Sequence, residues 1–515
     1  MRWWEWVLIA GASFLAVVAA SDLIQRRHAI LRNFPIVGHL RFLLEGIGPE
    51  LRQYIVTDND SDKPFSRDQR RWVYSSAKRQ NSLFGFGSDN DFEASPNYLV
   101  IRQVTFPFPE PTAPPAAVPG AINEQFPLPC AKVLGGPRNR KHAFRMASVV
   151  NVSSMSYGAL SAAAVESLNR GAALAGCVQG TGEGGISRHH RHGGDLVWQI
   201  GTGYFGCRDD QGNFSLERFR DTLAATPQIR AIDVKLSQGA KPGLGAILPA
   251  AKVTREVAEI RGIPEGVTCV SPAHHRAFGN VDGLLDFVEL LAQESGLPVG
   301  IKTAVGDESF FVELARLMAS GERGVDFVSV DGGEGGTGAG PLVFTDHVGL
   351  PFKVAFSRVY RIFVEAGVAE RVVLSGAGKL GLPQNALLAM ALGCDSINVG
   401  REAMLALGCI QAQRCHTGRC PTGVTTNSRW LMRGLDPDLK AARCANYVVS
   451  LRRELLELSR ACGEAHPALV GPDALEILDD HFGTLPARDV FGYQEGWGRP
   501  SATDQAELRR LIGVA

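Results

Sequence analysis

The sequence predicts an α/β protein built around a (β/α)8 TIM barrel. An N-terminal transmembrane helix and an extended arm precede the barrel, and a helical C-terminal extension follows it. Two observations predict the barrel. From Ala147 onward, short β-branched runs alternate with amphipathic helical windows, the pattern of a parallel sheet. Glycine-rich and polar stretches directly follow these runs, at the carboxyl strand ends where such barrels place their sites.

The composition is that of a globular, charge-balanced chain. Its 515 residues are 45% hydrophobic and include 53 basic and 53 acidic side chains. This length accommodates one large domain with appendages, or several ordinary domains. Balanced charge argues against nucleic acid as a partner. The ten cysteines are too few and too irregularly spaced for a disulfide scaffold.

The segment from Trp6 to Ile24 is almost wholly apolar and near the minimum length for a membrane span. Tryptophans at its start and arginines after it favour a single-pass anchor with the C-terminal body on the cytoplasmic side. These flanking residues are Trp3, Trp4 and Trp6, and Arg26, Arg27 and Arg32. A cleaved signal peptide is the alternative, although the basic n-region is weak because Glu5 offsets Arg2.

The next region, residues 26–145, lacks regular alternation and is expected to be an arm or cap. Arg41 to Tyr54 predicts short amphipathic helical pieces broken at Gly48-Pro49. Phe106 to Pro129 is proline-rich and should be extended. The predicted domain boundaries are therefore 1–25 (anchor), 26–145 (arm), 146–430 (barrel) and 431–515 (helical extension).

Within the barrel region, each expected strand is a short apolar run and each expected helix an amphipathic window. The strands are expected at Ser148–Val152, Ile229–Val234, Val299–Thr303, Phe327–Val330, Val372–Leu374 and Ser396–Val399. The helices are expected at Ser161–Ala175, Pro249–Arg261, Gly283–Ser295, Glu308–Ser320, Ser357–Glu365 and Pro383–Leu392.

A compact cysteine array lies where this alternation ends. Cys409, Cys415 and Cys420 are spaced C-x5-C-x4-C and close with a Cys-Pro step. Thiolates packed this closely are good iron–sulfur ligands, and such motifs often end in Cys-Pro. A zinc site with His416 as fourth ligand is one alternative. Three small buried residues without a metal are the other.

Three glycine-rich stretches predict a phosphate cradle. Asp331–Gly340 follows an expected strand, and Ser375–Lys379 and Asn398–Arg401 follow the last two. Loops after strands 7 and 8 commonly bind phosphate in TIM barrels, and Arg401 can add a bidentate charge. The G-x-G-x-x-G at Gly333 lacks the helix and the acidic residue of a dinucleotide-binding fold. A second G-x-G-x-x-G, at Gly201, Gly203 and Gly206, also lacks the following helix and the acidic residue.

Other strand ends and loops carry candidate catalytic groups. Lys235 ends an apolar strand, with Gln238 and Lys241 just beyond, where a lysine can stabilise a reduced flavin. Glu183 offers a carboxylate in a glycine-rich loop for substrate or proton handling. His274 and His275 have no metal spacing, and loop packing is the favoured role for them.

Six ordered motifs resemble the FMN-binding synthase domain of glutamate synthase over roughly residues 145 to 430. They are Met155–Ser161, Thr181–Gly185, Lys235–Gly243, Ser271–His275, Gly332–Gly338 and Gly408–Val424. The resemblance implies a (β/α)8 barrel that holds FMN beside a [3Fe-4S] cluster.

The resemblance also implies roles for individual residues. Cys409, Cys415 and Cys420 would bind the cluster. Glu183, Lys235 and Lys241 would be catalytic. The flavin would contact residues 155–158, residues in the stretch 235–238, and residues of the phosphate loops. These are Met155, Ser156, Tyr157, Gly158, Lys235, Gln238, Gly333, Gly376, Gly378, Gly400 and Arg401.

Departures from the family pattern bear on the substrate. No cysteine-nucleophile glutaminase domain fits ahead of residue 145, and the family's glycine-repeat β-helix is missing. Leu244 and Ile247 stand where the family has a carboxylate and an amide, which alters hydrogen bonding at the pocket lip. The chain resembles the short, anchored, stand-alone relatives more closely than the complete enzyme.

The expected activity is reduction of an imine of 2-oxoglutarate and ammonia to L-glutamate. Electrons would come from a separate donor, a ferredoxin or a reductase subunit. One rival is a flavin enzyme that acts on a different amino or 2-oxo acid. Another is a membrane electron-transfer component without a small-molecule substrate.

Overall fold

The computed structural model describes residues 2–80, 83, 85–92, 95, 97–109, 126, 128–479 and 483–514. The chain forms two compact units, residues 1–69 and 70–515. Most of the proline-rich arm expected over residues 106–129 lies outside the described residues.

The first unit is helical. It contains α1 (Trp3–Ile24), α2 (Ala29–Asn33), α3 (Gly38–Leu51) and the π-helical turn η1 (Arg52–Val56). The most apolar window of α1 has a mean hydropathy of 2.2 and is 6% buried, so the helix is apolar and long enough to cross a membrane. A signal sequence would share these properties. The break expected at Gly48-Pro49 is absent: α3 continues through Pro49 to Leu51, and the helix changes there to the π-helical turn η1.

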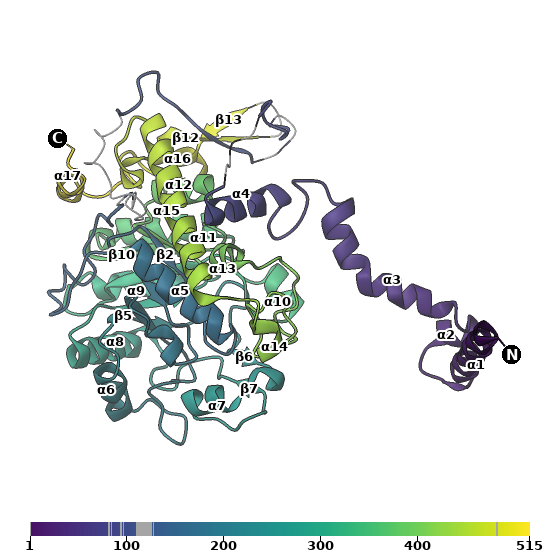
Figure 1. The fold of residues 1–515 in the computed structure, drawn as a ribbon. Helices are drawn as coiled ribbons and strands as arrows, with labels where there is room; N and C mark the ends of the chain where they lie inside the picture. The colour runs from purple at the N-terminus through teal and green to yellow at the C-terminus, as the bar shows by residue number, and fades with distance from the viewer. Residues whose placement is uncertain are drawn as a thin grey trace. The chain divides into compact units, whose positions relative to one another are not determined.

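The second unit contains a closed barrel of eight parallel strands (Figure 1). In chain order the strands are β2 (Val150–Val152), β3 (Gln179–Gly180), β4 (Leu196–Ile200), β5 (Ile229–Lys235), β8 (Val299–Thr303), β9 (Phe327–Asp331), β10 (Val373–Ala377) and β11 (Ser396–Val399). Pairing of Ile397 with Val150 closes the ring between β11 and β2. The predicted barrel is confirmed.

Helices alternate with these strands. They are α5 (Ala162–Ala175), α6 (Leu216–Ala224), α7 (Arg255–Arg261), α8 (Val281–Ser295), α9 (Ser309–Met318), α10 (Leu342–His347), α11 (Phe352–Glu365), α12 (Pro383–Ala391) and α13 (Arg401–Leu407). Prediction missed β3 and β4. Strand β3 has two residues and no β-branched side chain, and glycine-rich loops flank β4. The single helix predicted over Pro249–Arg261 is two, η3 (Ala250–Lys252) and α7, because Thr254 caps α7 with its own side chain.

The amino end of the barrel is closed by the segment before β2. Cys130, Leu134 and Met146 pack there against Val178 and Phe327 from the barrel. The barrel floor is therefore apolar, which leaves the opposite end for polar chemistry.

The C-terminal region packs on the barrel as helices and a small sheet. Helix α15 (Pro437–Ala461) lies beside α5, as Figure 1 shows. The shorter helices are α14 (Arg429–Met432), α16 (Ala487–Val490) and α17 (Ala502–Leu511). The extension also contains strands β12 (Leu475–Leu478) and β13 (Thr484–Pro486), which form a sheet with β1 (Leu99–Ile101). Helix α4 (Arg67–Lys78) spans the boundary between the two units.

Candidate active site

One cavity opens at the carboxyl end of the barrel. Its walls include residues at or just beyond the ends of all eight strands. One example from each strand in chain order is Ser153, Glu183, Gln199, Lys235, Lys302, Asp331, Gly378 and Gly400. Convergence of eight separate loops on one space is the arrangement that TIM barrels use for active sites.

The cavity brings most of the predicted site residues together. Lining it are Met155, Ser156, Glu183, Lys235, Gln238, Lys241, Gly378, Gly400, Arg401 and Cys415. The other predicted residues lie outside its lining. Tyr157 donates its hydroxyl hydrogen to Glu256 at 2.7 Å, and the N–H of Gly333 donates to the Leu350 carbonyl at 2.9 Å. Gly158 faces Val257, and Gly376 lies within β10 beneath Phe352.

Glu183, Lys235 and Gln238 form a connected group. The Lys235 ammonium donates to a Glu183 carboxylate oxygen and, at 2.7 Å, to the Gln238 side-chain oxygen. Burial raises the pKa of Glu183, but the charge and hydrogen bond of Lys235, helped by Lys241, outweigh burial and bring this pKa below its ordinary value. Glu183 is therefore a carboxylate at neutral pH.

Lys241 enters the same cavity from the loop after β5. Its ammonium donates to the Ala339 carbonyl at 2.9 Å, and the residue is 3% exposed. Burial and the positive charge of Lys235 lower the pKa of Lys241 to about 8. A buried ammonium that donates to a neutral carbonyl is suited to bind an anionic substrate group.

Sequence analysis missed Lys302, which lies one residue before the end of β8, whereas Lys235 is the last residue of β5. The two lysines are register partners on neighbouring strands. Lys302 lies 3.3 Å from the carboxylate of Asp331, and this carboxylate also accepts from the N–H of Gly239 at 3.0 Å. Burial lowers the pKa of Lys302, but the charges of Asp331 and Asp233 outweigh it and raise this pKa overall. The nearness to a strand end that singled out Lys235 would also have found Lys302.

Arg261 is a second cavity residue that sequence analysis missed. It is the last residue of α7, is 3% exposed, and donates to the Tyr157 carbonyl at 3.3 Å. Its Nε atom is buried without a hydrogen-bond partner. No local sequence pattern identifies it, because a basic residue in a last helical turn is ordinarily a surface residue.

The loops after β9, β10 and β11 meet and form one wall of the cavity. A Cβ atom on Gly336 would lie 2.6 Å from the Arg401 side chain, and one on Gly378 would lie 3.3 Å from Gly332. Arg401 donates to the Glu334 carbonyl. Glycine backbone and a partly buried guanidinium are suitable donors for a phosphate, so this wall fits the phosphate of FMN.

His275 has a structural role. Its Nε2 lies 2.9 Å from the Lys235 carbonyl and its Nδ1 lies 3.1 Å from the Tyr204 hydroxyl. A carbonyl only accepts, so Nε2 carries the proton and Nδ1 accepts from Tyr204. Burial lowers the pKa of His275 to about 4, so it stays neutral and supports the strand that carries Lys235.

The cysteine loop adjoins the cavity through Cys415. Lys252, 1% exposed, donates to the carbonyls of Ala159 and, at 3.1 Å, Cys415. Burial raises the pKa of Cys409 to about 11, and Cys415 and Cys420 add to this rise. In the part of the chain that the structure describes, no group of three His, Cys, Asp or Glu side chains is placed to hold a metal ion.

The family model for the conserved region in glutamate synthase matches residues 121–465. The chain belongs to the glutamate synthase family. The Bacillus subtilis glutamate synthase large subunit-like protein YerD is 35% identical over 499 residues, which cover 90% of this chain and 94% of that protein. A Rhizobium meliloti glutamate synthase large subunit-like protein is 30% identical over 70% of this chain and 83% of its own length.

This glutamate synthase family member also matches an archaeal glutamate synthase [NADPH] from Methanocaldococcus jannaschii. The identity is 34%, over 61% of this chain and only 59% of that protein's length. Among solved structures, a flavocytochrome b2 variant with pyruvate bound is 13% identical, with a TM-score of 0.40 over 91% of this chain and 90% of that one. A mandelate oxidase is 16% identical, with a TM-score of 0.38 over 65% and 80%.

Proposed function

We propose that this protein is an FMN-dependent oxidoreductase that reduces the imine formed from 2-oxoglutarate and ammonia to L-glutamate. The observation that supports this most is the gathering of Glu183, Lys235, Gln238 and Lys241 in one cavity beside the wall that fits a phosphate. Family membership adds support. Bound FMN would supply the hydride that reduces the imine carbon.

The residues of the chain would bind and orient the substrate. The ammonium of Lys241 binds a substrate carboxylate, and Arg261 is a second cation in the cavity wall. The pKa of Glu183 is lowered, so this residue accepts a hydrogen bond from the protonated imine nitrogen instead of donating a proton to it. Lys235 holds Glu183 and places positive charge where the flavin ring is proposed to lie.

An anaerobic flavin experiment tests the proposal. The purified protein is reduced, and its flavin absorbance is followed after addition of 2-oxoglutarate, ammonium or both. Reoxidation that requires both compounds is expected. Reduced flavin that persists with both present would contradict the glutamate assignment, and a folded, FMN-supplemented sample without a flavin band would contradict the cofactor assignment.

A different 2-oxo acid is the second candidate substrate. Ile247 lines the cavity with Ala246 and Leu248, so this part of the lip is apolar. An apolar lip favours a substrate whose distal end needs no hydrogen bond there. A panel of 2-oxo acids with ammonium, scored by flavin reoxidation, separates the two candidates. Faster reoxidation by an acid with an apolar side chain would favour the second.

Binding of a [3Fe-4S] cluster by Cys409, Cys415 and Cys420 is a separate proposal. It is supported by the C-x5-C-x4-C spacing, and no step above passes through the cluster. Iron and acid-labile sulfide in the ratio of this cluster are expected in anaerobically purified protein, and Cys415→Ser should lose them while it retains flavin. Zinc in place of iron would support the alternative with His416.

We also propose that α1 is a retained membrane anchor and that a separate protein donates electrons. Hydropathy and the tryptophan and arginine flanks support the anchor. Both G-x-G-x-x-G stretches lie in or beside barrel loops rather than in a dinucleotide-binding unit, which supports a separate donor. An intact N-terminus in membrane-extracted protein, measured by mass spectrometry, would exclude a cleaved signal peptide.

A further inference from the structure

Helix α3 and the turn η1 present an exposed apolar face. Its residues recur at intervals of three and four and therefore share one side of the helix. They are Leu40, Leu43, Leu44, Ile47, Leu51 and Tyr54, each between 40% and 59% exposed. A continuous row of large apolar side chains in water is unfavourable, and such a row marks an interaction site.

The opposite side of α3 is charged. Arg41, Glu45 and Arg52 fall there by helical spacing, and Arg41 contacts Glu45 at 2.7 Å. Distinct apolar and charged sides are typical of helices that lie in the plane of a membrane surface. Arg41 and Arg52 are balanced by Glu45 and Glu50, so binding of this helix to a membrane would depend on its apolar face and not on attraction to anionic lipid.

Contacts within the first unit tie the start of α3 to the end of α1. The carboxylate of Asp22, two residues before α1 ends, accepts from the N–H of Ile36 at 2.9 Å and contacts Nε2 of His39 at 2.9 Å. His28, in the connection, packs edge-on against Phe42 with ring centroids 5.5 Å apart. The beginning of α3 is therefore held at the C-terminal end of α1.

The length of α1 fixes where that end lies if the helix crosses a bilayer. Its 22 residues span about 33 Å, close to the hydrocarbon thickness of about 30 Å. The C-terminal end of α1, and with it the start of α3, then falls at the boundary between headgroups and acyl chains. The exposed apolar face of α3 begins at that boundary.

We propose that α3 and η1 lie in the interface of the bilayer that α1 crosses, with their apolar face among the acyl chains. The occupant of this face is lipid. The proposal rests on the membrane anchor proposed above. It makes the membrane-bound part of the chain a spanning helix joined to an in-plane helix.

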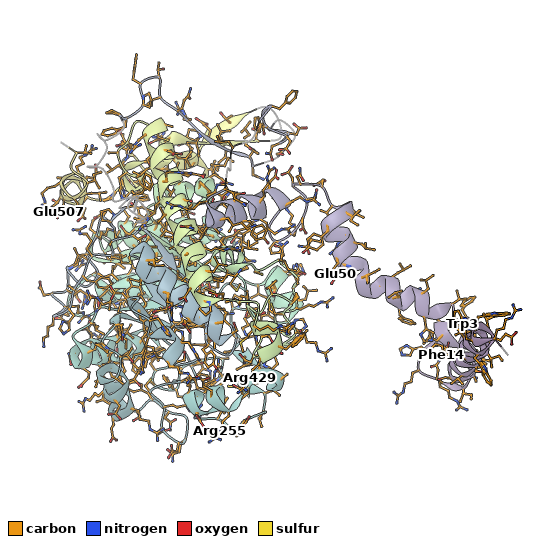
Figure 2. The ribbon with its side chains drawn as sticks, in the orientation of Figure 1. Trp3, Phe14, Glu50, Arg255, Arg429 and Glu507 are labelled. Atoms are coloured by element: carbon orange, nitrogen blue, oxygen red, sulfur yellow. The ribbon has the colours of Figure 1, made fainter. Side chains whose placement is uncertain are left out.

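Site-specific photo-crosslinking tests this in the full-length protein in phosphatidylcholine vesicles. The photoreactive residue p-benzoylphenylalanine replaces Leu44 on the apolar face, Glu45 on the charged face, or Phe14 on α1. Phe14 is 67% exposed; Phe14 and Glu50, which lies on α3, are labelled in Figure 2. After irradiation, mass spectrometry is expected to find lipid adducts at Phe14 and Leu44, and at least several-fold fewer at Glu45.

The outcomes separate failure of this proposal from failure of the anchor. Lipid adducts at Phe14 without adducts at Leu44 would overturn the in-plane helix and leave the anchor standing. Crosslinks from Leu44 to the protein's own body or to a second copy would also overturn it. No adducts at either position would overturn the anchor and the proposal together. Leu51 serves as a second test position if the Leu44 variant has an altered circular dichroism spectrum.

Discussion

At the residue scale, the lysines of the barrel mouth pair with carboxylates from distant parts of the chain. Lys235 contacts Glu183, and Lys302 contacts Asp331. The sequence alone places Lys235 and Lys302 near the barrel mouth, because each follows apolar residues of a strand. Neither pairing follows from sequence spacing, because each carboxylate belongs to another strand or loop. A buried charge without its partner is costly, so these pairs can be tested by removing one partner.

Lys235→Met should strongly destabilise the protein. It leaves the mostly buried carboxylate of Glu183 without its ion-pair partner, and we expect the free energy of unfolding to fall by about 3–5 kcal/mol. Urea denaturation measures this change. Combining Lys235→Met with Glu183→Gln should recover part of the loss, because the amide carries no charge. A single variant as stable as the unaltered protein would contradict the importance of the pair.

The lowered pKa of Lys241 predicts weaker binding of an acidic substrate at alkaline pH. The folded-state pKa, about 8, lies below the ordinary 10.5, so the ammonium is lost as pH rises through about 8. Above that pH, Kd for 2-oxoglutarate should rise by up to about tenfold per pH unit.

Flavin absorbance titrations across this range measure the Kd. Lys241→Arg should remove the pH dependence of Kd, because a guanidinium remains charged.

The lowered pKa of Lys241 also affects the stability of the fold. Between about pH 8 and 10.5 the unfolded state binds the Lys241 proton more tightly, so the contribution of this residue to stability rises with pH.

At the element scale, glycines let the loops at the barrel mouth approach one another. A Cβ on Gly239 would lie 1.8 Å from the carbonyl oxygen of Gly332, so the loops after β5 and β9 touch through backbone. This approach also places the N–H of Gly239 against Asp331, the partner of Lys302. The glycine-rich composition predicted close backbone approach, but not which loops would meet.

Gly239→Ala should force these two loops apart. We expect the free energy of unfolding to fall by at least about 1–3 kcal/mol, together with weaker FMN binding. Gly306→Ala is the matched control, since a Cβ there would have no atom within 4 Å in the described structure. Equal FMN affinity in the two variants, measured by fluorescence titration, would argue that the contact is unimportant for the site.

At the scale of the whole molecule, the C-terminal extension is part of the barrel's packing. Helix α15 lies against α5 so closely that a Cβ on Gly171 would be 2.6 Å from the Cβ of Cys444. Composition predicted a helical extension here, and the structure shows that its longest helix covers a barrel helix. Strands β12 and β13 were not predicted.

Gly171→Ala should therefore destabilise the whole second unit. Overpacking between α5 and α15 is expected to lower the free energy of unfolding by about 1–3 kcal/mol. Leu174→Ala, on the same helix but 45% exposed, should change it by less than about 0.5 kcal/mol. Thermal and urea unfolding of both variants measure these changes. Equal losses of unfolding free energy in the two variants would show that α5 and α15 can move apart at little cost.

The sequence alone predicted the barrel and six of its eight strands, and most of the site residues that it predicted line the barrel mouth. It could do so because strand periodicity is local, and because parallel strands of one barrel all present their carboxyl ends at one rim. Lys235, Gln238 and Gly378 were found in this way. The strands β3 and β4 were missed where a short or glycine-flanked segment weakened the local pattern.

Only the tertiary structure decided which charges meet. Arg261 reaches the cavity from the end of a helix, and Glu183 and Asp331 each meet a lysine from another strand. The structure also showed that the apolar residues of α3 form one exposed face joined to the end of α1. Which charges pair and which side chains stay exposed depends on distances between segments that are remote in sequence, and local periodicity does not encode those distances.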